Sequence, residues 1–167
     1  MIRLFKQLSI QVVFALSLLL SSTAHTEDIL LNLGDLDGGS FYSLAYGVNA
    51  DGSVVVGISN SGNGYEAFRW TEGTGMVALG DLAGGGFDSY AYSVNADGSV
   101  VVGVSTSGNG DEAFRWTEGT GMVALGDLAG GGFDSYAYSV NADGSVVVGV
   151  STSGNGDEAF RWTEGTG

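Results

Sequence analysis

The feature that most constrains this chain is a 46-residue unit that is written three times. The same spacing separates the tryptophans of the three units, which are Trp70, Trp116 and Trp162. The stretch 81–121 is identical to 127–167, whereas 35–75 differs from 81–121 at eight of 41 positions. Repeats of this length stack into arrays in which each unit contacts its neighbours. Because the copies are so alike, repetition alone does not separate functional residues from copied ones.

Each unit contains four segments with strand character, which in the middle copy are 89–95, 99–105, 112–117 and 122–128. The first segment alternates, and this predicts Tyr90, Tyr92 and Val94 on one face. The second segment is β-branched and apolar on both faces, as is typical of a strand that is covered on both sides. In the third segment, Phe114 and Trp116 share a face.

Turn residues separate these segments. Asn-Ala-Asp-Gly at 95–98 joins the first two, and Gly-Asn-Gly at 108–110 joins the second and third. Asp and Gly favour turns, and Asn-Gly is a preferred core of tight hairpins. No segment of the repeats shows a sustained helical period. The sequence therefore predicts an all-β fold.

Four antiparallel strands in a repeat of about 40–50 residues are typical of a β-propeller blade. We therefore expect a propeller-like array of three four-stranded blades. The expected domains are a signal peptide at 1–24, an N-terminal strand within 25–36 that completes the array, and repeats at 37–82, 83–128 and 129–167. The last repeat lacks its fourth strand, and the N-terminal strand is expected to take that place.

Propellers have about four to eight blades, and this chain supplies three. Three interpretations remain open: two chains form a six-bladed homo-oligomer, the chain is a truncated piece of a longer parent array, or the blades form an open arc. The sequence stops inside a repeat that it copies faithfully, which favours truncation. An open arc exposes apolar sheet faces at both ends.

The N-terminal segment has the three-part pattern of a secretory signal peptide. Arg3 and Lys6 precede an apolar stretch at 10–20, and small residues then lead to a predicted cleavage site between Ala24 and His25. This stretch is shorter than the ~20 residues of a membrane-spanning helix. We expect an exported protein, periplasmic or extracellular, with no integral membrane segment after signal removal.

Charge and composition exclude several kinds of chemistry. From residue 25 onward the chain has three Arg, no Lys and 19 acidic residues, a formal charge of −16. Such a surface does not suit nucleic acid, because phosphate contacts need clustered basic residues. The chain has no Cys, and its single His is His25. We therefore predict no nucleic-acid partner, no cofactor, no metal site and no enzymatic activity.

The repeat resembles a known family. The segments that carry the resemblance are Gly-Asp-Leu-Ala-Gly-Gly-Gly (80–86), Tyr-Ser-Val-Asn-Ala-Asp-Gly-Ser-Val-Val-Val-Gly (92–103), Glu-Ala-Phe-Arg-Trp-Thr (112–117) and Gly-Met-Val-Ala-Leu-Gly (121–126). They are similar to the bacterial extracellular repeat called the HAF family, over 29–167, and to repeats in autotransporter-like passenger regions. Glu66, Glu112 and Glu158 stand where that family has the histidine of His-Ala-Phe. The resemblance implies secretion and a propeller-like repeat, without a defined activity.

The third strands carry the predicted structural core of the repeats: Phe68, Trp70, Phe114, Trp116, Phe160 and Trp162. Their regular placement on one face favours packing between blades over a sugar-binding groove.

The favoured function is a non-enzymatic binding or structural scaffold at the cell surface or outside the cell, with its ligand unassigned. The alternatives are a carbohydrate-binding or calcium-dependent surface module and a fragment of a secreted hydrolase. The Asn-Ala-Asp-Gly-Ser segment lacks the spaced ligands of a calcium loop and is interpreted as a turn. The adjacent carboxylates Asp111 and Glu112 are expected to point to opposite faces, which does not suit paired acid–base chemistry.

Overall fold

The structure is a computed structural model that describes residues 29–165. The predicted signal peptide and its cleavage site between Ala24 and His25 lie outside the described residues. The chain divides into two units, 1–31 and 32–167, and every strand described below belongs to the second. Within residues 29–165, no helix has the length and apolar character needed to cross a membrane.

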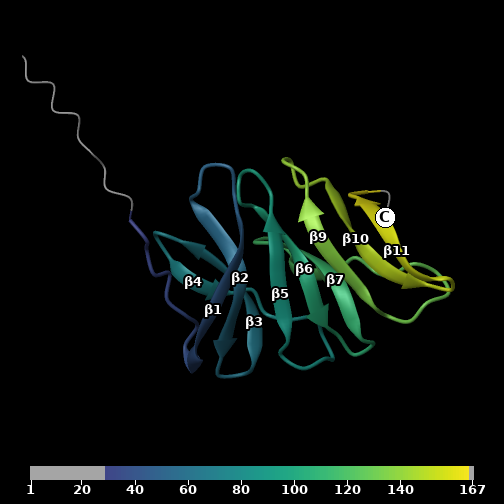
Figure 1. Cartoon of the computed structure of the whole chain (residues 1–167), viewed down its shortest axis with the longest axis horizontal. Coiled ribbons are helices and arrows are strands. Elements are labelled where there is room, and N and C mark those ends of the chain that lie inside the picture. Colours follow the sequence, from purple (N-terminus) through teal and green to yellow (C-terminus); the bar gives the residue numbers. More distant parts are fainter. Residues whose placement is uncertain (1–28, 166–167) are drawn as a thin grey trace, which may run out of the picture. The chain divides into compact units, whose positions relative to one another are not determined.

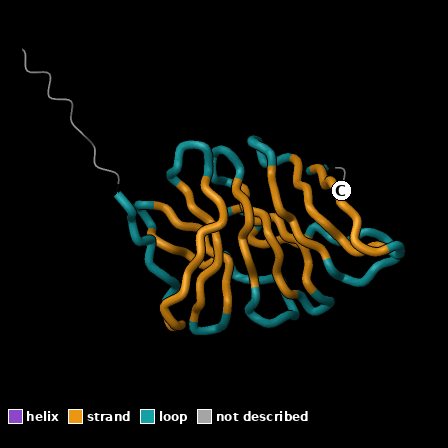
Figure 2. The backbone as a smooth tube through the Cα atoms, in the orientation of Figure 1, coloured by secondary structure: helices purple, strands orange, loops and turns teal. Residues whose placement is uncertain are grey.

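In the described part of the chain, eleven strands form three antiparallel sheets (Figure 1). Sheet 1 contains β1 (Gly38–Val48), β2 (Val54–Ser61), β3 (Tyr65–Thr71) and β4 (Gly75–Ala78). Sheet 2 contains β5 (Ser89–Val94), β6 (Val100–Thr106), β7 (Asp111–Thr117) and β8 (Gly121–Ala124). Sheet 3 contains β9 (Ser135–Val140), β10 (Val146–Ser153) and β11 (Gly156–Thr163). The strands of each sheet pair in chain order, and short loops join them (Figure 2). The all-β prediction is confirmed.

The fourth strands are shorter than the sequence predicts. The segment expected at 122–128 is a strand only as far as Ala124, and the described part of the segment expected at 25–36, residues 29–36, is not a strand. Backbone groups there bond to serine side chains instead of to a ladder: Leu36 N donates to Ser59 Oγ at 2.9 Å. This serine contact ends the extended pairing and turns the chain toward the next strand.

The hydrophobic core lies between consecutive sheets. We call the side of a sheet that faces the following sheet its back face, and the other side its front face. The first cluster joins the back of sheet 1 to the front of sheet 2 and includes Val54, Val56, Ala67, Ala91, Val94, Val101 and Phe114. The second joins sheets 2 and 3 and includes Val100, Val102, Ala113, Ala137 and Val147. Strand β6 is therefore covered on both faces, as its sequence predicts.

Glycines in the middle of the second strands allow a close approach of three chain segments. A Cβ atom at Gly103 would lie 1.8 Å from the carbonyl oxygen of Tyr90 and 2.9 Å from Cε1 of Phe114. The ring of Phe114 thus occupies the space that a side chain would need. Of the six predicted core aromatics, Phe68 and Phe114 are buried, and Trp70, Trp116, Phe160 and Trp162 are half-buried.

One buried serine hydroxyl links each sheet to the next by hydrogen bonds. Ser135 Oγ accepts a hydrogen bond from the Ala113 N–H at 2.9 Å and donates to the Gly126 carbonyl at 3.0 Å. Ser89 makes the same two bonds, with Ala67 and Gly80, between sheets 1 and 2. Because buried polar groups need partners, these serines fix how far apart neighbouring sheets lie.

Candidate functional site

A row of tyrosines runs across the first strands of the three sheets. Strand β5 contacts both β1 and β9, and each of the three strands has a register irregularity at one tyrosine. The ring of Tyr92 lies 5.8 Å, between centroids, from the ring of Tyr46 and also from the ring of Tyr138. The row is thus a continuous aromatic surface supplied by all three repeats.

The irregularity at Tyr92 is a β-bulge, and because of it the strict alternation predicted for this strand is wrong beyond Tyr92. Ala91 pairs with Gly103 and Ser93 with Val102, so that Tyr92 is the extra residue. Tyr90 and Tyr92 stack at 6.4 Å, as expected for residues on one side. Val94 was expected beside them but lies in the core cluster with Ala91, because the bulge shifts the alternation by one residue.

Beside this row, sheets 2 and 3 enclose a recess of about 250 Å³. Its lining combines tyrosine rings with carboxylates and comprises Asp88, Tyr90, Tyr92, Val104, Thr106, Asp111 and Tyr136. Tyr136 comes from β9 of sheet 3, and the other lining residues precede or belong to strands of sheet 2. The recess is therefore a property of two adjacent repeats and does not exist in one alone.

Hydrogen bonds hold one of the two carboxylates in place. Asp111 Oδ2 accepts from the Tyr136 hydroxyl at 3.2 Å, and Asp111 Oδ1 accepts from Thr106 Oγ1 at 2.8 Å. Asp88 differs, because its Oδ1 is buried without a hydrogen-bond partner in the described structure. Asp88 and Asp111 thus place two carboxylates in the lining of the recess.

The tyrosine hydroxyls of the recess remain protonated over a wide pH range. Burial, together with the Asp88 carboxylate beside it, raises the pKa of Tyr90 to about 12. Burial, followed by the Asp134 and Asp111 carboxylates, raises the pKa of Tyr136 as well. Near neutral pH the recess therefore offers phenolic donors and carboxylate acceptors side by side.

The recess is also where the copies differ. Eight positions distinguish 35–75 from 81–121, and five of them lie on residues that line the recess. These five residues are Asp88, Tyr90, Val104, Thr106 and Asp111, which replace Tyr42, Leu44, Ile58, Asn60 and Tyr65 of the first copy. Between sheets 1 and 2, the rings of Tyr42 and Tyr65 instead pack edge to face at 5.6 Å. The sequence analysis gave Asp88, Tyr90 and Asp111 no binding role, although the positions at which the copies differ point to them.

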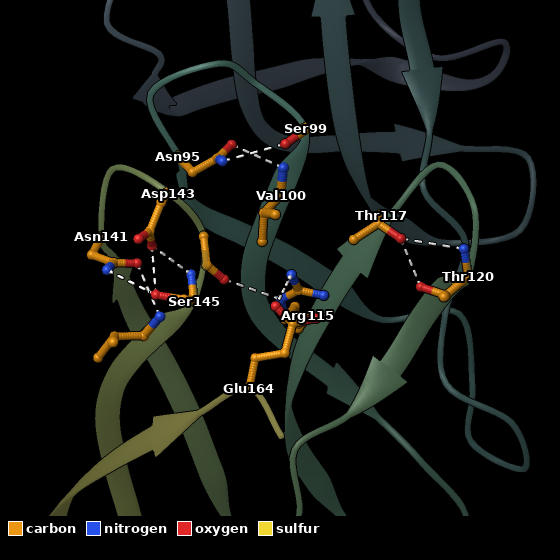
Figure 3. Close-up of polar contacts among 12 residues, drawn as sticks. Asn95, Ser99, Val100, Arg115, Thr117, Thr120, Asn141, Asp143, Ser145 and Glu164 are labelled. Carbon is orange, nitrogen blue, oxygen red and sulfur yellow. Dashed lines mark hydrogen bonds and ion pairs between the residues drawn. The ribbon is translucent and has the colours of Figure 1, made fainter. Parts of the chain in front are cut away.

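The Asn-Ala-Asp-Gly-Ser turns lie in another region, shown in Figure 3, and have a structural role. Asn95 Oδ1 accepts from the Val100 N–H at 2.9 Å. Asp97 Oδ1 accepts from both the backbone N–H and the hydroxyl of Ser99, and these bonds lower the pKa of Asp97. Gly98 completes the turn at φ +77°. Residues 29–165 contain no group of three or more His, Asp or Glu side chains that could hold a metal ion.

The adjacent carboxylates of the third strand separate as predicted. Asp111 faces the recess, whereas Glu112 is buried and accepts from Ser107 Oγ at 3.0 Å and Asn109 Nδ2 at 3.1 Å. Glu112 therefore secures a hairpin.

Comparison of the chain with known proteins finds a likeness by structure. No model of a known protein family matches it, and no curated protein matches it. By structure it is similar to the crystal structure of TolB from Acinetobacter baumannii, a β-propeller-containing protein, with a TM-score of 0.57 and 17% sequence identity. The match covers 78% of this chain and 31% of TolB, so the chain spans about a third of that protein. At this identity the likeness shows the fold alone.

Proposed function

We propose that the chain is an exported, non-enzymatic repeat protein whose three sheets are blades of a propeller-type array, and that it binds its ligand in the recess between sheets 2 and 3. The observation that carries this proposal is the recess itself, which is lined by three tyrosine rings together with the carboxylates of Asp88 and Asp111. The predicted signal peptide and the resemblance to HAF repeats support export and an extracytoplasmic location.

The ligand class that fits best is a neutral carbohydrate. Tyrosine rings present flat apolar faces to the C–H groups of a sugar ring, and carboxylates accept hydrogen bonds from its hydroxyls. The charge of −16 from residue 25 onward disfavours anionic ligands. At about 250 Å³, the recess lies just below the ~300–1,000 Å³ of drug-sized sites and suits one sugar ring.

Isothermal titration calorimetry with a panel of neutral hexoses, N-acetylhexosamines and their oligomers tests this proposal. Asp88→Ala and Asp111→Ala are expected to weaken binding at least tenfold. The control is Glu118→Ala, which removes an exposed carboxylate in the turn between β7 and β8, outside the lining of the recess. Unchanged binding in both recess variants would exclude the recess, and no binding across the panel would exclude neutral sugars.

The same samples test the absence of catalysis and of a calcium requirement. Mass spectrometry after long incubation is expected to recover intact oligosaccharide. Binding is expected to be equal with calcium and with a chelator, because the turns already use their carboxylates internally. Cleaved products would favour the hydrolase alternative, and loss of binding on chelation would favour the calcium-dependent one.

A further inference from the structure

The chain builds one interface twice, with the same residues each time. In both interfaces, a valine and an alanine on the back face of one sheet are fully buried by the next sheet. They are Val56 and Ala67 in sheet 1, and Val102 and Ala113 in sheet 2. The faces that receive them carry Ala91 in sheet 2 and Ala137 in sheet 3, both 0% exposed.

At the two ends of the array, the same positions are open. On the back of sheet 3, Val148 is 43% exposed, while its copy Val102 is 0% exposed. On the front of sheet 1, Val48 is 59% exposed, while its copy Val94 is 8% exposed. Since sheet 3 bears the sequence of sheet 2, its back face has the composition of a surface that is covered elsewhere in the same molecule.

The hydrogen bonds across the interfaces show what would cover these faces. Donors on the back face of one sheet meet acceptors on the next: the Ala67 N–H meets Ser89 Oγ, and the Ala113 N–H meets Ser135 Oγ. In sheet 3, the N–H that corresponds to those of Ala67 and Ala113 belongs to Ala159. The acceptor of the same kind is Ser43 Oγ in sheet 1, which bonds the Gly34 carbonyl just as Ser89 bonds Gly80.

A second series runs through the turns. Arg69 Nε donates to the Gly98 carbonyl at 3.1 Å, and Arg115 Nε donates to the Gly144 carbonyl at 3.3 Å (Figure 3). The corresponding donor in sheet 3 is Nε of Arg161, and the corresponding acceptor in sheet 1 is the carbonyl oxygen of Gly52.

The turn backbones form a third series. The Ala50 N–H bonds the Ala96 carbonyl at 3.3 Å, and the Ala96 N–H bonds the Ala142 carbonyl at 3.1 Å. The next bond would join the Ala142 N–H to a carbonyl like that of Ala50. All three series therefore end in donors on sheet 3 and in acceptors on sheet 1.

We propose that the back face of sheet 3 docks on the front face of sheet 1 of a second copy of this chain, and that two copies close head to tail into a ring of six sheets. Each copy has one face that supplies hydrogen-bond donors and one face that supplies acceptors. Two equivalent contacts between two copies therefore cover both faces of each copy. Head-to-tail contacts either close or grow into filaments, and a six-sheet ring falls within the ~4–8 blades of propellers. This proposal does not depend on the recess binding a sugar.

Light scattering and sedimentation velocity on the purified protein test the closed pair. The expected result is one species of twice the chain mass, which becomes more prominent with salt because salt screens the repulsion between two acidic copies. Val148→Asp places a charge in the docking face and is expected to give monomers with unchanged β-type circular dichroism. The matched control, Val123→Asp, changes a valine that is 49% exposed on β8, away from both end faces, and should leave the pair intact. Monomers at all concentrations and salt levels, or a ladder of polymers, would overturn the proposal.

Because the chain has no cysteine, a crosslink can test which faces meet. In an Ala50→Cys/Ala142→Cys variant, a short thiol-specific crosslinker is expected to join two chains, since the proposed contact places Ala142 of one copy beside Ala50 of the other. Moving the second cysteine to the exposed loop position Gly132 should abolish the product. Equal crosslinking in both double variants would show that the contact is not the proposed one.

Discussion

Replacing Ser135 by alanine tests whether single hydroxyls hold the sheets together. The Ser135 hydroxyl is fully buried and joins the Ala113 N–H of sheet 2 to the Gly126 carbonyl that precedes sheet 3. The substitution removes one oxygen atom and adds no group to the buried site. The change in stability therefore reports the two hydrogen bonds.

The expected cost follows from which groups lose their partner. The Ala113 N–H is buried between sheets, and leaving such a donor unsatisfied costs about 1–3 kcal/mol. Gly126 is exposed, so water can replace the hydroxyl at its carbonyl. We expect Ser135→Ala to lower the free energy of unfolding by about 2–3 kcal/mol, a large part of the ~5–15 kcal/mol of a typical domain.

Ser43 provides the matched control, because among residues 29–165 its hydroxyl bonds only the Gly34 carbonyl. Ser43→Ala should cost less than about 1 kcal/mol, as expected for one hydrogen bond that water can replace. Both variants are compared by urea unfolding in a Val148→Asp background, so that association between chains does not contribute. Equal losses for the two serines, or a loss below about 0.5 kcal/mol for Ser135→Ala, would refute the assignment of these bonds as the fastening between sheets.

Two further predictions concern the close-packed glycine and the tyrosine recess. Gly103→Ala is expected to prevent folding, since the new Cβ would lie 1.8 Å from the Tyr90 carbonyl oxygen, whereas Gly86→Ala meets nothing within 4 Å and should fold normally; circular dichroism and soluble yield distinguish the two. Tyr90 is expected to ionise near pH 12, above the ~10 of an unfolded tyrosine, so its contribution to stability is complete below pH 10 and is lost as the pH rises through 12. Ultraviolet titration of phenolate measures this, and an amplitude near pH 12 that is not reduced in Tyr90→Phe would contradict the assignment.

Local sequence patterns predicted the strands well because turn chemistry and alternation are short-range signals. The turn at Asn95 and the two-sided burial of β6 follow directly from residue types. The lengths of the fourth strands were not predictable in this way. Gly126 leaves the extended conformation at φ +82°, and the Leu128 N–H donates to the Ser151 hydroxyl, a partner that lies 23 residues away in the sequence.

The recess escaped prediction for two physical reasons. The bulge at Tyr92 changes which side chains share a face, and no residue type in this segment indicates a bulge. The recess also combines two repeats, since Tyr136 of one meets Asp111 of the other. Contacts of this kind depend on how sheets stack, which the period of a sequence does not specify.

The positions at which the copies differ distinguish the residues that line the recess from the residues that hold the sheets together. A sheet in the middle of an array must fit a neighbour on each face, so a change on either face disturbs an interface that the next copy must also match. Of the five recess positions at which the first two copies differ, Val104 is buried and the other four are half-buried, so most of them are less constrained than the fully buried positions of the faces. Five of the eight positions that distinguish the first two copies line the recess, whereas the fastening serines, the close-packed glycines and the turn asparagines are the same in every copy. Substitutions at the half-buried recess positions should therefore alter binding with less effect on the stacking of sheets than substitutions at the fully buried positions of the faces.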